Sequence, residues 1–170
     1  IGKRERGIFA PTSTPVTFNV LADPASTLTL ADRDANLAFR SKASKLSSDI
    51  SQASEAATTA RTKLAAIVRV LDQMPSAPAA LRTRVRALDT QLLGILREIN
   101  GDDVNSARGE QVPVSIRTHA GGAFPSGSQR PTGSNIQQYD IASAAFAIEY
   151  AKLKPILVTE LPAVDAELDR

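Results

Sequence analysis

His119 is the only histidine of the chain, and it precedes a pair of glycines in a segment rich in glycine and proline. An imidazole can serve as a general base or as a metal ligand. Because the chain has no cysteine and no second histidine, a metal site would need carboxylates such as Asp102, Asp103 or Glu110. Their spacing does not match a calcium-binding loop. We therefore predict a structural or solvent-exposed His119 and no metal ligands.

Two other short patterns superficially suggest chemistry. Ser126 lies in a Pro-Ser-Gly run, but the Gly-x-Ser-x-Gly sequence of a nucleophile elbow is absent. The Ala-Gly-Gly-Ala run at 120–123 has no following Gly-Lys-Ser/Thr, which a phosphate-binding loop requires. The sequence thus predicts no catalytic residue, no cofactor-binding residue and no enzyme activity of this chain.

Composition excludes several further classes. Charged residues make up 22% of the 170 residues, and the net charge is +2, too small to indicate a nucleic-acid partner. The basic cluster Arg82, Arg84 and Arg86 lacks neighbouring aromatic residues, so we predict a solvated helix face that pairs with acids. No apolar run is long enough to span a membrane. The first residues contain neither Met nor an apolar signal core, and we expect this chain to be part of a longer protein.

The segment that must organise the fold is a long apolar stripe. Eleven apolar residues follow one another in alternating steps of four and three, which is a heptad seam on one helix face. No glycine or proline interrupts residues 26–73, so one helix is expected over 29–74, broken if anywhere near the serines at 47–54. Thr29 and Asp32 suit a capping box at its start. The seam residues are Phe39, Ala43, Leu46, Ile50, Ala53, Ala57, Ala60, Leu64, Ile67, Leu71 and Met74.

Two further helices are predicted to cover this stripe. The second spans 78–100 and ends at Gly101; the third spans 133–169, with an irregular step beside Pro155 and Pro162. The glycine- and proline-rich loop 101–132 is expected to shield the first turns of the long helix. The second seam is Leu81, Val85, Leu88, Leu92, Ile95 and Ile99; the third is Ile136, Tyr139, Ser143, Phe146, Tyr150, Leu153, Leu157, Leu161, Val164 and Leu168.

Residues 1–28 differ from the rest of the chain. Residues 16–20, Val-Thr-Phe-Asn-Val, alternate as a β-strand does. A lone strand is not stable, so this region is either an arm on the helices or the last strand of an upstream β-domain, and we favour the second. The predicted fold is all-α: an up-down-up three-helix bundle over 29–170 with one very long first helix, preceded by a short strand or extended arm.

Several short runs resemble a known family. Residues 18–24, followed by the helix start at Ala31 and Asp32, resemble the join after the β-rich part of bacterial BNR-repeat glycosyl-hydrolase-like or sortilin-like β-propeller proteins. The runs at 114–117 and 159–168 resemble short segments of the helical C-terminal region of that family. The resemblance implies a non-catalytic C-terminal module of a secreted, periplasmic or cell-envelope protein whose propeller lies upstream and can itself be a glycosyl hydrolase.

The functional hypothesis is a structural or interaction module that carries out no reaction. Its partner would be the upstream β-domain or another protein, and the long helix could also extend its seam into a homodimer. The alternative is a ligand- or protein-binding module that uses the loop 101–132. The candidate interaction residues in that loop are His119, Arg117, Phe124 and Arg130.

Overall fold

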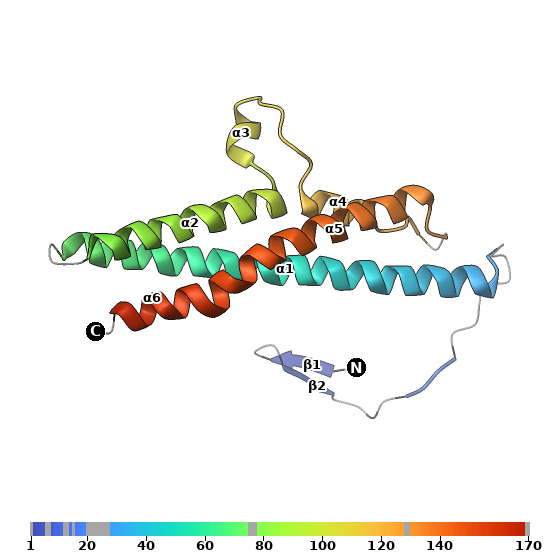
Figure 1. Ribbon diagram of the computed structural model, residues 1–170. Coiled ribbons are helices and arrows are strands. Elements are labelled where there is room, and N and C mark those ends of the chain that lie inside the picture. Colours follow the sequence, from blue (N-terminus) through green and yellow to red (C-terminus); the bar gives the residue numbers. More distant parts are fainter. Residues whose placement is uncertain are drawn as a thin grey trace.

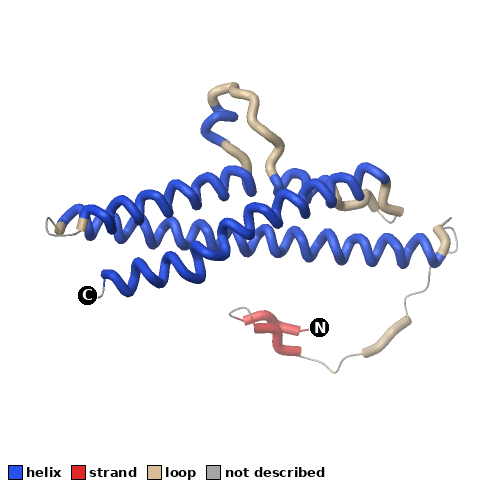
Figure 2. Tube along the Cα trace, in the orientation of Figure 1, coloured by secondary structure: helices blue, strands red, loops and turns tan. Residues whose placement is uncertain are grey.

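The computed structural model describes residues 2–5, 8–11, 14, 16–19, 28–74, 78–127 and 130–168, and Figures 1 and 2 show a molecule built mainly of helices. The prediction of an all-helical fold with a very long first helix is confirmed. The helical elements are α1 (Leu30–Gln73), α2 (Ala79–Asn100), α3 (Asp103–Ala107), α4 (Ile116–Gly122), α5 (Gly133–Pro155), the π-helical turn η1 (Ile156–Glu160) and α6 (Leu161–Leu168).

Helix α1 begins at the predicted capping box. The backbone N–H of Asp32 donates to Oγ1 of Thr29 at 3.1 Å, and the Asp32 carboxylate accepts from the Thr29 backbone N–H at 3.4 Å. The helix then continues without a break for 44 residues, or about 66 Å. The serine-rich stretch does not interrupt it, because Leu46, Ile50 and Ala53 on the same turns are buried. Their packing outweighs the weak helix propensity of serine.

The α1 seam forms the centre of the core. All its predicted members from Ala43 to Leu71 are buried, and Phe39 is half-buried with its ring centroid 5.8 Å from that of Tyr139. Met74 is the exception, with 47% of its surface exposed. That assignment was wrong because α1 ends at Gln73, and Met74 leaves the helical conformation as its C-cap.

Helix α2 runs back along the C-terminal part of α1 (Figure 1), and all six predicted seam residues are buried. At one end, Nη2 of Arg82 donates to the carbonyl oxygens of Leu71 and Met74, where α1 ends. At the other end, Gly101 adopts a φ of 104°, a conformation that favours glycine and stops the helix as predicted.

The segment 101–132 is more ordered than a loop. It contains α3 and α4, and α4 packs against α1, α2 and α5, with Ile116 in the core. Its last part reaches the start of α1, where Arg40 donates to the carbonyl oxygen of Gly127 at 3.0 Å and Arg130 pairs with Asp32. These contacts join the segment to the start of α1, although Leu30 and Leu37 in its first turns remain 74% and 70% exposed.

The third predicted helix is divided into α5, η1 and α6. Among its buried side chains, Ile156 and Leu161 are five residues apart, a step that a π-helical turn accommodates and an α-helix does not. The irregularity predicted beside the two prolines is confirmed.

The predicted seam was wrong in the first half of this helix. Ile136 and Tyr150 are 45% and 47% exposed, whereas Ala142 and Glu149 are buried. The small side chain of Ala142 permits close approach to neighbouring helices, and the carboxylate of Glu149 accepts a hydrogen bond from Nζ of Lys152 at 2.6 Å. These two features turn the buried face away from the expected one.

The strand predicted at residues 16–20 is not present where the chain is described. Residues 16–19 have no regular secondary structure, Val16 and Phe18 are more than four-fifths exposed, and Val20 lies outside the described residues. An alternating apolar–polar pattern forms a stable β-strand only where a second strand can hydrogen-bond with it. The strands β1 (Gly2–Glu5) and β2 (Ile8–Pro11) lie earlier and pair antiparallel, with Gly2 opposite Pro11.

Candidate interaction surfaces

The four residues singled out in the sequence do not converge on one site. His119 lies on α4 rather than in a loop, is half-buried, and has its Nδ1 atom 2.6 Å from Oε1 of Gln138 on α5. This hydrogen bond joins two helices that pack closely against each other. His119 is therefore held in place by a neighbouring helix.

Arg117 joins three helices. Its Nε donates to Oδ1 of Asn100 at the end of α2 at 3.0 Å, and its Nη1 donates to Oγ of Ser51 on α1 at 3.2 Å. The Asn100 side chain in turn donates to Oγ of Ser54 at 3.0 Å. This network closes the junction where α2 ends and α4 begins.

Phe124 and Arg130 lie on either side of the turn before α5. Phe124 is half-buried, and its carbonyl oxygen accepts from the side-chain amide of Asn135 at 3.2 Å. Arg130 is 72% exposed, with its Nε 3.4 Å from Oδ1 of Asp32. The hydrogen bond to the Thr29 side chain lowers the pKa of the Asp32 carboxyl, and the charge of Arg130 acts in the same direction. Both residues fasten the loop to a helix start.

The carboxylates considered as metal ligands do not form a cluster either. Asp102 caps α3 by accepting from the backbone N–H of Asn105 at 3.1 Å, and it lies 3.3 Å from Nε of Arg97. Asp103 and Glu110 are exposed. Across the described ranges, no group of three or more histidine, aspartate or glutamate side chains is placed to hold a metal ion.

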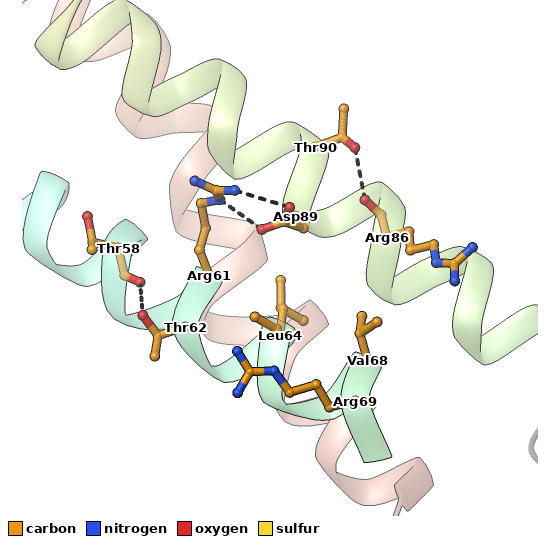
Figure 3. A pocket seen from close by; sticks show the side chains of 10 residues that line it. Thr58, Arg61, Thr62, Leu64, Val68, Arg69, Arg86, Asp89 and Thr90 are labelled. Atoms are coloured by element: carbon orange, nitrogen blue, oxygen red, sulfur yellow. Dashed lines mark hydrogen bonds and ion pairs between the residues drawn. The ribbon is translucent and has the colours of Figure 1, made fainter. Parts of the chain in front are cut away.

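A groove of about 740 Å³ lies between α1 and α2 (Figure 3). Leu64 lies in its floor, and Arg61 reaches across from α1 to Asp89 on α2, with Nε–Oδ1 and Nη2–Oδ2 distances of 2.8 and 3.2 Å. The hydrogen bond to Asp89 raises the pKa of the Arg61 guanidinium. The bidentate ion pair bridges the two helices across the groove, so it also has a structural role.

The basic cluster on α2 pairs mostly with acids on neighbouring helices. Arg84 lies 2.8 Å from Oε2 of Glu160, and Arg86 lies 3.7 Å from Oδ1 of Asp72. Asp89, which lies on the same helix as the cluster, is bound by Arg61 of α1. The prediction of a solvated face that pairs with acids holds for these two arginines.

The larger groove, about 820 Å³, lies between α1 and α5. Its walls include Tyr139, Phe146 and Tyr150, which the sequence placed in the core. Nζ of Lys42 lies 4.1 Å from the centroid of the Tyr139 ring, within the range of a cation–π contact. The rotation of the buried face of α5 explains this groove, because it leaves Tyr139 and Phe146 only half-buried and Tyr150 exposed.

Within the described ranges, no helix has the length and apolar character that crossing a membrane requires. Comparison with models of protein families, with curated proteins and with solved structures found no match. The functional interpretation therefore depends on the surfaces described above.

Proposed function

We propose that this chain is a non-catalytic structural and interaction module. The observation that carries the proposal is that its chemistry-bearing side chains are used to join helices. His119 links α4 to α5, Arg117 links α4 to α1 and α2, and Arg61 links α1 to α2. A side chain that is held in this way supports a rigid shape.

The proposed shape is an up-down-up three-helix bundle. Figure 1 shows α2 running opposite to α1, while α5 and α6 run in the direction of α1. Because α2 has only half as many residues as α1, α4 and α5 supplement it along the first half of the long helix. An element of this length suits a spacer between an upstream domain and a partner.

From the family resemblance, we further propose that the module is the C-terminal accessory domain of a larger secreted, periplasmic or cell-envelope β-propeller protein. The resemblance lies in the residues around the start of α1 and in the run 159–168. The reading frame upstream of Ile1 tests this proposal. It should encode a signal peptide and repeated propeller blades, and a different upstream domain would contradict the assignment.

A screen against glycoside, ester and phosphoester substrates tests the non-catalytic role. We expect the purified chain to hydrolyse none of them faster than buffer, because His119 is occupied by Gln138. A matched His119→Ala variant separates activity of this chain from that of a contaminant. Turnover by the wild-type chain that this variant lost would overturn the proposal.

A second candidate function, binding through the segment 101–132, is favoured by one specific feature. The stretch 102–114, which includes α3, projects from the helices in Figure 1, and Val104 and Val114 on it are 55% and 60% exposed. Its base is narrow, because a Cβ atom on Gly101 would lie 3.7 Å from that of Ser115. An exposed projection with a closed base is typical of a recognition loop.

Replacing residues 102–114 with a Gly-Ser-Gly linker tests whether the projection is available for binding. None of the α3 residues is buried, and shortening a loop changes its closure entropy by only about 1–2 kcal/mol. We therefore expect thermal unfolding within a few degrees of wild type and an unchanged circular dichroism spectrum. A large loss of stability would show that the projection braces the helices and would contradict the binding role.

A further inference from the structure

The outward side of α5 carries a second apolar stripe, which we call the outer stripe: Ile141, Ala144, Ile148 and Ala151. Its steps of three, four and three match a heptad seam, and all four residues are exposed, with Ile141 and Ile148 at 39% and 60%. Val158, seven residues beyond Ala151, is exposed to 66%. At about 100° per residue, the stripe is centred about 140° around the helix from the buried Ala142, Glu149 and Leu153.

A helix that is apolar on opposite sides is normally covered on both. The buried side of α5 packs on α1, α2 and α4 of the same chain, whereas the residues of the outer stripe are exposed. In Figure 1 the run from α5 to α6 passes in front of α1. The alanines of the outer stripe leave room for a second helix to approach closely. The surface thus has the form of a helix–helix interface with one partner missing.

The charges beside the stripe indicate what the partner is. Asp140, Ala147 and Lys154 follow one another at seven-residue intervals along one flank, and all three are exposed. If a second α5 lies antiparallel about an axis near Ala147, Asp140 of each copy meets Lys154 of the other. In a parallel pair, Asp140 and Lys154 would instead face Ala145 and Thr159 of the other copy, which carry no charge. Antiparallel helices also align their dipoles favourably.

From the exposed seam and this charge symmetry, we infer that the chain forms a homodimer through antiparallel pairing of the outer stripe of α5. The inference goes beyond the proposed scaffold role and does not depend on an upstream β-domain. An interface made by one helix from each copy lies at the small end of stable interfaces. A dissociation constant on the order of 10–100 μM is therefore expected.

Sedimentation equilibrium of the whole chain from about 1 μM to about 1 mM measures this constant. We expect the mean mass to rise from 18.0 kDa toward twice that value. Ile148→Asp should weaken the dimer about 100-fold, because it places two carboxylates near the symmetry axis. Val70→Asp, at a 51% exposed position on α1, is the matched control and should leave the dissociation constant unchanged.

Exchanging the charges of Asp140 and Lys154 tests whether the two α5 helices pair antiparallel, even if the Ile148 variant does not fold. Asp140→Lys and Lys154→Asp should each weaken dimerisation, since each places like charges opposite one another, and the double variant should restore it. A wild-type chain that stays monomeric at about 1 mM would overturn the inference. So would a dimer that is insensitive to Ile148→Asp, or a double variant no tighter than the single ones.

Discussion

Replacing Leu92 with alanine is expected to lower the free energy of unfolding by about 2–5 kcal/mol. The Leu92 side chain is fully buried in the α2 seam and belongs to the same core cluster as Leu64 of α1 and Leu153 of α5. Truncation leaves a cavity where the long helices meet, and rigid helices cannot close it fully. Urea denaturation followed by circular dichroism measures the change.

The matched control is Leu37→Ala, the same substitution on a surface that is 70% exposed. Because Leu37 lies outside the α1 seam, we expect a change within about 0.5 kcal/mol. If both variants lost equal stability, α2 would not be packed on α1 as described. The comparison thus tests the packing of the long helices without relying on any functional assay.

The first two helices could be predicted from the sequence because each has only one apolar face. Along α1 and α2 the four-three spacing is regular, and most of the remaining positions are polar apart from isolated residues such as Leu37 and Val70, so one side of each helix is clearly the buried one. The ends were equally well marked, by the capping residues Thr29 and Asp32 and by Gly101, a glycine that adopts a positive φ where α2 ends. Local chemistry determines these features, and it is visible in the sequence.

The orientation of α5 could not be predicted in the same way, because apolar residues occur all around it. Several seams fit such a helix, and the choice among them depends on the shape of the neighbouring helices. The regular seam through Tyr139 and Tyr150 was preferred, whereas the structure buries Ala142 and Glu149. A glutamate is seldom buried without a partner, and its bond to Lys152 three residues on is the signal that was missed.

The candidate interaction residues could not be grouped from sequence for a related reason. His119 pairs with Gln138 of α5, and Arg130 pairs with Asp32 of α1. Such contacts depend on how the elements pack, and no local spacing records them. The prediction of a structural or solvent-exposed His119 depended on the lack of plausible metal or catalytic partners in the sequence, and its contact with Gln138 of α5 could not be read from local spacing.

Deleting Val158 is expected to change the free energy of unfolding by less than about 1 kcal/mol, although it removes a residue inside a helical region. Val158 is 66% exposed and lies in the π-helical turn. After the deletion, the buried residues that follow Leu153 would succeed one another at steps of three, four and three, which a continuous α-helix accommodates. The π turn would become an α turn, and Val164 would stay in the core.

Deleting Ala151, also exposed but one turn before η1, should have the opposite effect. The extra residue lies only further on, in η1, so the side chains between the deletion and the π turn turn by about 100° around the helix axis. Leu153 and Ile156 would leave the core, and each contributes about 1.5–3 kcal/mol when buried. We expect a much lower urea midpoint than for the Val158 deletion. Equal effects of the two deletions would mean that the π turn does not set the register of α6. A strong difference would show that η1 accommodates one extra residue and so keeps the α6 side chains in the core.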